Sequence, residues 1–127
     1  MTYRSKITVI SILGAAAVVI GAFGAHGLKP HLDAGALETY KTASFYHFSH
    51  LMPMLMIALS VQDSKYANWA FNAFLAGILF FSGSLYLLSV RVLIGGDVWN
   101  FLGPITPIGG LFFIIGWLML LKVFPKG

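Results

Sequence analysis

Long uncharged runs alternate with short clusters of charged residues along the whole chain. The uncharged runs cover residues 7–25, 42–62, 66–90 and 98–121. A helix needs about 20 mostly apolar residues to cross the hydrocarbon layer of a bilayer, which is about 30 Å thick. Lipid holds no water to satisfy free backbone groups, so spanning segments of this kind are helices. The pattern predicts an all-α integral membrane protein, with four transmembrane helices in one domain over residues 1–127.

The first run, 7–25, also has features of a secretory signal peptide. Arg4 and Lys6 precede it, and the small residues near Ala25 offer a cleavage site. Its length is nevertheless that of a transmembrane helix. We therefore expect this run to be retained as the first span.

The connection between the first two spans, residues 29–41, carries a helical pattern of its own. Asp33 is placed to cap a helix, and Glu38 and Lys41 lie three residues apart on one helical face. Apolar side chains also recur every four residues through this connection, ending at Tyr40. These features predict a short interfacial helix, or an extension of the second span beyond the bilayer.

The composition excludes an ordinary soluble domain and several kinds of chemistry. Hydrophobic residues make up 58% of the chain and charged residues 9%, with a mean hydropathy of +0.85, whereas a soluble domain is about 25% charged. The absence of cysteine excludes disulfides and thiolate metal sites. The net charge of +4 comes from basic residues scattered between apolar runs, which favours contact with lipid head groups and no binding of nucleic acid.

The basic residues also predict the orientation in the membrane. With four spans, the side that holds both termini and the second connection carries five Lys or Arg, and the other side carries three. Segments rich in Lys and Arg remain preferentially in the cytoplasm. Both termini are therefore expected to be cytoplasmic.

Small residues recur on three of the predicted spans and indicate where helices approach closely. In lipid, helices associate through van der Waals contact and interhelical hydrogen bonds, which favours small residues at contact faces. Packing within one bundle is the preferred interpretation, and a face for self-association is the alternative. The expected packing positions are Gly14, Ala17, Gly21, Ala25, Gly77, Gly83, Gly109, Gly110 and Gly116.

Prolines interrupt the second and fourth spans. Pro53 removes the backbone bond to the Ser49 carbonyl, so we expect a kink near His50. Pro104 and Pro107, among several glycines, predict that the fourth helix is bent or partly non-helical at its start. A transporter uses such broken backbone to hold an ion. A simple corner is preferred here, because no intramembrane acid or base lies beside the segment.

Two histidines are the main candidates for chemistry. His50 lies about 12 Å inside the predicted boundary of the second span, near the middle of the bilayer, and His26 ends the first span. In one interpretation the pair, alone or with His47 or Met54, ligates haem or a soft metal such as copper. In the preferred one, His50 bonds to Tyr46, a serine or a freed carbonyl, and His26 bonds to the same polar face of the second span. The spans contain no carboxylate and no HExxH motif, which argues against a paired-acid hydrolase and a carboxylate-bridged di-iron site.

Five motifs, in order, resemble one family over nearly the whole chain. They are GAFGAHGL at 21–28, YHFSH at 46–50, FSGSLYLL at 81–88, PITPIGG at 104–110 and GW at 116–117. They are similar to the domain-of-unknown-function 423 family of small bacterial inner-membrane proteins, which is related to the eukaryotic transmembrane protein 256. The resemblance implies four transmembrane helices in the bacterial cytoplasmic membrane and no assigned activity. It matches the polar positions His26, Tyr46, His50, Ser82, Ser84, Tyr86 and Thr106, whereas His47 stands where the family pattern has glutamine.

These observations leave three functional hypotheses. The preferred one is a small membrane protein without catalytic chemistry or cofactor, which binds lipid, packs against other membrane proteins or forms a homo-oligomer. The alternative is a binding or transport module for a small hydrophobic molecule, a quinone or an ion, with its cavity between Pro53 and residues 104–110. The third is a haem or metal redox protein that uses His26 and His50.

Overall fold

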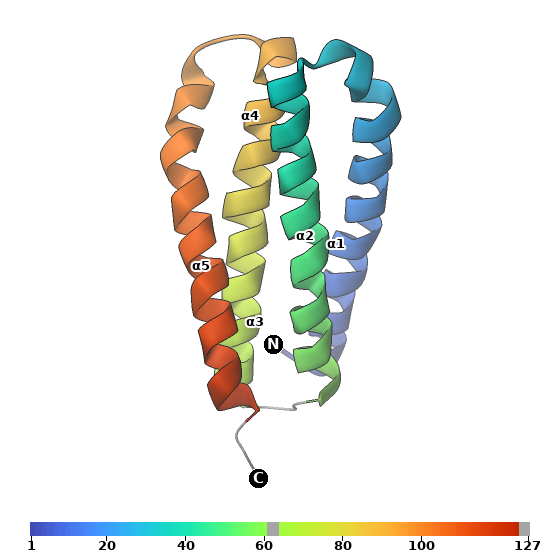
Figure 1. Ribbon diagram of the computed structural model, residues 1–127. Coiled ribbons are helices and arrows are strands. Elements are labelled where there is room, and N and C mark those ends of the chain that lie inside the picture. Colours follow the sequence, from blue (N-terminus) through green and yellow to red (C-terminus); the bar gives the residue numbers. More distant parts are fainter. Residues whose placement is uncertain (61–63, 125–127) are drawn as a thin grey trace.

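The structure is a computed structural model that describes residues 1–60 and 64–124. Every regular element within these residues is helical (Figure 1), which confirms the all-α prediction. The elements are α1 (Tyr3–Phe23), the π-helical turn η1 (Gly24–Leu28), the 3-10 turn η2 (Lys29–His31), α2 (Ala34–Ser60), α3 (Lys65–Gly77), the π-helical turn η3 (Ile78–Ser82), α4 (Gly83–Ile94), the 3-10 turn η4 (Val98–Phe101) and α5 (Leu102–Val123).

The described elements join into four long rods, which run up and down the molecule (Figure 1). η1 and η2 continue α1, and α3, η3 and α4 follow one another as a single rod, Lys65–Ile94. The main packing contacts join α1 to α2, α2 to the α3–α4 rod, and that rod to α5. The rods therefore stand in a row, with α1 and α5 at its two ends, and α1 begins at the same end of the molecule at which α5 finishes (Figure 1).

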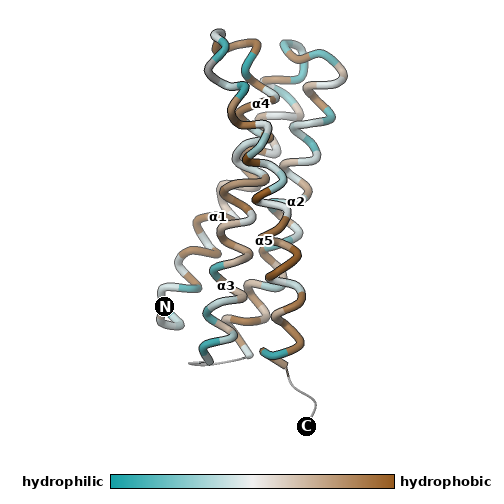
Figure 2. Tube along the Cα trace, turned by 90° about the vertical axis from the view of Figure 1, so that its left-hand side faces the viewer, coloured by the Kyte–Doolittle hydropathy of each residue, from teal (hydrophilic) through white to brown (hydrophobic). Residues whose placement is uncertain are grey.

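Three of the four rods are long and apolar enough to cross a membrane: Tyr3–His31, Lys65–Ile94 and Trp99–Val123. Figure 2 shows hydrophobic residues along the middle of the rods and hydrophilic ones gathered toward both ends. α2 is not among the three, although it has 27 residues. Two histidines and a proline near its middle lower its average hydropathy.

α2 begins earlier than the predicted span. The Asp33 side chain caps it, because its Oδ1 accepts a hydrogen bond from the Ala36 backbone N at 2.8 Å, and the helix continues unbroken from Ala34 to Ser60. The separate interfacial helix is therefore wrong, since residues 34–41 are the first turns of α2, and the alternative of an extended second span is correct. The last residues predicted for that span, 61 and 62, lie outside the described residues.

α5 is more regular at its start than its prolines predict. The predicted span 98–121 does begin irregularly, with the 3-10 turn η4, but from Leu102 the chain is α-helical through Pro104 and Pro107. The irregular start therefore lies at 98–101, and the expectation of partly non-helical backbone over 104–110 is wrong. Pro104 lies in the first turn of α5, where a backbone N–H has no intrahelical partner to lose. Pro107 removes one backbone bond, and the close packing of α5 on the α3–α4 rod holds the helix in place.

The core lies where α2 and α5 pack on the α3–α4 rod. Glycines allow α5 to approach closely: a Cβ on Gly109 would collide with the backbone of Phe80 and Phe81, and one on Gly116 would lie 2.8 Å from the Phe74 ring. Close van der Waals contacts of this kind hold the helices together, because the hydrophobic effect does not drive helices together in lipid. The largest fully buried side chains are Met54, Ile57, Phe71, Phe74 and Ser82.

Candidate functional site

Polar side chains of α2 and α4 point into the row of rods and bond to backbone or side chains of neighbouring helices. The uppermost contact joins α2 to α1: the Tyr40 hydroxyl donates to the Ile20 carbonyl at 2.5 Å. The Tyr40 ring also packs edge-on against Tyr86 of α4, with ring centroids 5.2 Å apart. Tyr40 therefore ties three helices together at the end where α1 finishes and α2 begins.

His47 bridges three helices one level deeper. Its Nε2 lies 3.0 Å from the Leu13 carbonyl of α1, and its Nδ1 lies 3.0 Å from the Tyr86 hydroxyl of α4. A carbonyl oxygen only accepts, so Nε2 carries the hydrogen and Nδ1 accepts from Tyr86. The ring is 3% exposed, and its one donor and one acceptor are both used in the neutral form.

His50 makes the equivalent contacts toward α5, with the opposite tautomer. Its Nδ1 lies 2.7 Å from the Tyr46 carbonyl, and its Nε2 lies 3.1 Å from the Trp117 indole Nε1. The indole N–H only donates, so Nε2 is an acceptor and Nδ1 carries the hydrogen. The ring also stacks on Phe113, with centroids 3.7 Å apart. Both nitrogens of this neutral imidazole are therefore engaged by the protein.

Hydroxyl groups join the remaining helices. Ser82 is fully buried and donates to the Ala43 carbonyl of α2 at 2.8 Å. The Ser84 hydroxyl lies 2.6 Å from the Thr106 hydroxyl of α5. These bonds connect the α3–α4 rod to α2 on one side and to α5 on the other. The hydroxyl groups of Ser82, Ser84 and Thr106 therefore serve to pair helices.

His26 is separate from this network. It is exposed in η1 and makes no hydrogen bond with the described residues, so the expected bond to the polar face near Tyr46 is not formed. The Ile20–Tyr40 and Leu13–His47 bonds fix the register of α1 on α2. At 1.5 Å per residue, this register places His26 and His50 about 24 Å apart along the bundle.

That separation does not fit a haem or metal centre shared by His26 and His50. One metal ion needs its histidine nitrogens at about 2 Å, and both nitrogens of His50 already have protein partners. Among residues 1–60 and 64–124, no three His, Cys, Asp or Glu side chains are grouped to hold a metal ion. The structure therefore does not bring His26 and His50 together as a shared pair of ligands.

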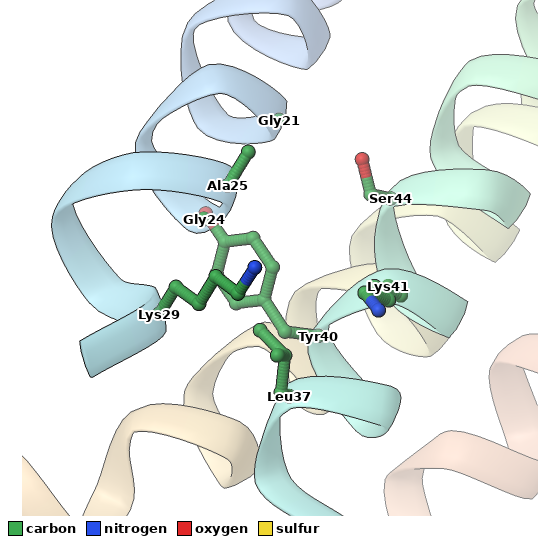
Figure 3. Close-up of a pocket in the computed structure, with 8 residues that line it drawn as sticks. All are labelled: Gly21, Gly24, Ala25, Lys29, Leu37, Tyr40, Lys41 and Ser44. Atoms are coloured by element: carbon green, nitrogen blue, oxygen red, sulfur yellow. The ribbon is translucent and has the colours of Figure 1, made fainter. Parts of the chain in front are cut away.

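Two hollows lie beside the polar network. A groove of about 500 Å³ separates α2 from α5 and is lined by the rings of Tyr46, His50, Phe81, Phe113 and Trp117, with Pro107 and Gly110 at one edge. A smaller cavity of about 190 Å³ lies between the end of the first rod and the start of α2 (Figure 3). Its lining residues are Gly21, Gly24, Ala25, Lys29, Leu37, Tyr40, Lys41 and Ser44.

The small residues singled out in the sequence fall into three groups. Gly77, Gly109 and Gly116 lie where a Cβ would meet a side chain or backbone of the facing helix within 3.0 Å, whereas Gly14, Gly21 and Gly110 have only ordinary neighbours at 3.5–3.9 Å. Ala17 is buried, Ala25 is exposed beside the smaller cavity, and Gly83 has no neighbour from another helix within 4 Å.

Sequence reasoning missed the role of three residues of the network. His47, Tyr40 and Trp117 each bond across helices, yet Tyr40 and Trp117 were not candidate positions and His47 was considered only as a further metal ligand. His47 carried a signal, because an imidazole near the middle of an apolar span needs two polar partners. Tyr40 and Trp117 carried none, since aromatic residues at the ends of spans ordinarily mark the membrane interface.

Three long apolar rods, joined by short connections and bonded internally through buried polar groups, define a helical membrane protein. The comparisons with known proteins agree and give the family. The family described as a protein of unknown function, DUF423, matches residues 20–110. The chain belongs to this family, which confirms the resemblance drawn from the five motifs.

Relatives extend the match to nearly the whole chain. A UPF0382 membrane protein of Haemophilus influenzae is 41% identical over 115 residues, covering 90% of this chain and 88% of the relative. A UPF0382 membrane protein of Bacillus subtilis is 38% identical over 128 residues, covering 93% and 97%. A third, from Staphylococcus aureus, is 44% identical over 106 residues, covering 83% and 82%. No solved structure matches the chain.

Proposed function

We propose that this protein is a four-span scaffold of the bacterial cytoplasmic membrane without catalytic chemistry of its own. It acts through the surfaces that it offers to lipid and to other membrane proteins, or to further copies of itself. The observation that carries this proposal is the bonding of His47 and His50, because each ring has its donor and its acceptor engaged by neighbouring helices. A general base or a metal ligand needs a lone pair that is free for substrate or metal.

The distribution of side chains around α2 supports a fourth crossing. Its polar residues His47 and His50 are buried against other helices, so they do not meet lipid. Beyond Lys41, its exposed large side chains are aromatic or aliphatic, and they are Phe45, Tyr46, Phe48, Met52, Met56 and Leu59. A mean hydropathy averages over the whole circumference of a helix and does not register this arrangement. At 1.5 Å per residue, 27 residues span about 40 Å, more than the hydrocarbon layer requires.

Cysteine labelling tests the fourth crossing directly. The chain has no cysteine, so single variants at Lys29 and Lys65, which flank α2, report without background. We expect a membrane-impermeant maleimide to label Lys29→Cys from the periplasmic side of intact cells. Lys65→Cys is expected to react only after the membrane is opened, as is a reference position at Ser5. Labelling of both flanking positions from one side would disprove the crossing by α2.

The absence of catalytic chemistry is tested on purified protein. If the protein is a scaffold, its absorption spectrum has no Soret band, elemental analysis finds no stoichiometric metal, and no substrate is converted. Substitution of its polar residues then changes only its stability. A substrate conversion that disappears in His50→Gln, with thermal stability retained, would overturn the proposal. The matched control is Ser49→Ala, which changes a neighbouring polar side chain that makes only long contacts of 3.4 Å.

The groove between α2 and α5 favours a second candidate, a binding module for a planar hydrophobic molecule such as a quinone. Its volume of about 500 Å³ falls within the usual 300–1,000 Å³ of ligand pockets. Its wall is aromatic, with Tyr46 and Phe81 rings 4.6 Å apart, which suits stacking of a ring against it.

Enrichment of a bound molecule tests this second candidate. Lipid-soluble compounds that co-purify with the protein are identified by mass spectrometry, and Gly110→Leu places a side chain at the edge of the groove. We expect an aromatic compound with the unmodified protein and its loss in Gly110→Leu, while Gly103→Leu, whose Cβ position has no neighbour within 4 Å, retains it. Equal content in all three proteins would exclude binding in the groove.

A further inference from the structure

The smaller cavity lies at a junction between apolar and charged surface. Its inner wall consists of Gly21, Gly24 and Ala25 from the end of the first rod, which face Leu37 and Ser44 of α2 (Figure 3). The cavity is open there because the glycines and the alanine fill little space.

Tyr40 closes one side of the cavity and keeps the two walls in position. A Cβ on Gly24 would collide with the Tyr40 ring, and the Tyr40 hydroxyl is bonded to the Ile20 carbonyl at 2.5 Å. The aromatic ring thus fills the gap at the level of Gly24. The hollow of about 190 Å³ remains beside it.

Two lysines stand at the mouth of the cavity, one on each wall. Lys29 comes from η2 and reaches toward the gap between the helices, and Lys41 stands on α2 opposite (Figure 3). Lys41 pairs with Glu38 at 3.3 Å, but both side chains are exposed, and such pairs are weak. Lys29 takes part in no salt bridge among the described residues. The mouth of the cavity is therefore positive.

The expected depth of the cavity in the membrane agrees with its division into an apolar inner wall and a positively charged mouth. The two uncharged runs that flank it end at residue 25 and resume at residue 42. The glycine-lined wall consequently lies at the outer part of the hydrocarbon layer, and the ammonium groups lie at the level of the head groups. A molecule that fills the site is thus apolar inward and anionic outward.

The volume decides how much of a molecule enters. Pockets that enclose a whole small molecule measure about 300–1,000 Å³, so a hollow of about 190 Å³ accepts only part of one. A segment of a single acyl chain is unbranched and slender, and it fits between helices. Haem and other large ring systems do not.

We propose that this cavity binds one anionic phospholipid, with its phosphate between Lys29 and Lys41 and part of one acyl chain against Gly21 and Ala25. The inference rests on the four-span scaffold proposed above, because that topology places the two lysines at the bilayer surface. It goes beyond the scaffold by assigning a defined lipid site to one end of the α1–α2 pair.

Lipid retention tests the site. Protein is reconstituted in phosphatidylcholine vesicles that contain phosphatidylglycerol as a minor component, released in mild detergent and examined by native mass spectrometry. We expect one phosphatidylglycerol to be retained in preference to phosphatidylcholine. Lys29→Gln/Lys41→Gln is expected to weaken this binding about 30-fold, since the loss of each basic residue near an anionic surface weakens binding about fivefold.

Two controls separate a built site from general attraction. Arg91→Gln/Lys122→Gln removes the same charge from exposed positions that do not line the cavity, and it should leave retention unchanged. Ala25→Leu keeps both lysines but fills the hollow. It should also reduce retention about 10-fold without lowering the thermal midpoint, because Ala25 is exposed.

Three outcomes would overturn the proposal. They are unchanged retention in Lys29→Gln/Lys41→Gln, an equal loss in the charge control, and unchanged retention in Ala25→Leu. Glycerol 3-phosphate, which has the phosphate without a tail, should not compete, and full competition would instead indicate a site for soluble phosphate esters. Cysteine labelling at Lys29 and Lys65 reports the topology independently, so failure of the lipid site and failure of the scaffold proposal are distinguishable.

Discussion

At the residue scale, the buried histidines His47 and His50 both use their two ring nitrogens in hydrogen bonds, but with opposite tautomers. A polar group in the interior of a membrane protein needs partners, because lipid offers none. His47 donates through Nε2 to Leu13 and accepts at Nδ1, whereas His50 donates through Nδ1 to Tyr46 and accepts at Nε2 from Trp117. For His50 this pairing requires the neutral ring, since a proton on Nε2 would face the Trp117 indole N–H, which donates and cannot accept.

Coupling between His50 and Trp117 should be measurable. We expect the double variant His50→Phe/Trp117→Phe to be less destabilised than the sum of the two single variants, by about 0.5–1.5 kcal/mol. Each single change leaves the other partner without its hydrogen bond, and phenylalanine keeps a ring against Phe113. Unfolding in mixed micelles gives the free energies, and strict additivity would show that the 3.1 Å contact contributes nothing.

The role of His47 predicts which substitution is tolerated. Glutamine carries both an amide donor and a carbonyl acceptor, so His47→Gln should retain most of the stability. His47→Leu removes both functions, leaves the Tyr86 hydroxyl without its acceptor, and should cost about 1–3 kcal/mol. Thermal unfolding in detergent compares the two variants, and equal midpoints would contradict a bridging role.

At the element scale, close approach of backbones holds α5 on the α3–α4 rod. Gly109 faces the backbone of Phe80 and Phe81 inside the π-helical turn η3. A π-turn inserts an extra residue into the helical repeat and shifts side chains around the axis. η3 therefore combines two features in one turn: backbone exposed to α5, and the buried Ser82 hydroxyl bonded to α2.

This contact predicts a sharp difference between two glycines of the same helix. Gly109→Ala places a methyl group against the backbone of η3, which cannot move aside as a side chain does, and should destabilise the protein by about 1–3 kcal/mol. Gly103→Ala has open space around its Cβ position and should be neutral or slightly stabilising. Comparable losses in both variants, measured by thermal unfolding, would refute the close approach.

At the scale of the whole molecule, the row of rods makes their exposure unequal. Within the apolar windows, 39% of the Lys65–Ile94 rod is buried, compared with 11% of the first rod and 17% of the last. The α3–α4 rod has neighbours on two sides, while the first and last rods stand at the ends of the row (Figure 1). The outer rods therefore present most of the surface available to lipid or to a partner.

Photolabelling from within the bilayer should reproduce this order. A hydrophobic carbene precursor dissolved in the lipid is expected to modify Tyr3–Phe23 and Leu102–Val123 more heavily per residue than Lys65–Ile94. Peptide mass spectrometry gives the yields, and protein unfolded in detergent serves as the control with even labelling. Equal labelling of the three segments in the folded protein would contradict the row arrangement.

Much of the fold follows from local sequence. The runs at 7–25, 66–90 and 98–121 predict three of the rods, because length and apolar composition are properties of a segment by itself. The Asp33 cap and the helical pattern after it identified the early start of α2 as one of two alternatives. Pro104 and Pro107 led to a wrong prediction of partly non-helical backbone. The free energy lost with the helical hydrogen bond at Pro107 is outweighed by the packing of α5 on the α3–α4 rod.

The candidate site was predictable only in part. His50, Ser82, Ser84, Tyr86 and Thr106 were singled out as polar positions, and each bonds within the protein. Tyr46 was among the partners expected for His50, and the bond is made to its backbone carbonyl, but the other partners were not identified. His26, paired with His50 in the metal hypothesis, lies at the exposed end of the first rod. Neither π-turn was expected from the sequence.

The sequence by itself determined that the chain forms apolar helices suited to lipid, because that outcome depends on hydropathy and backbone hydrogen bonding within each segment. Only the tertiary structure decided which polar groups meet. His50 and Trp117 are 67 residues apart in the chain, and His47 and Leu13 are 34 apart. Such pairs depend on the relative rotation and register of packed helices, which the close contacts at glycines such as Gly109 set and no single segment encodes.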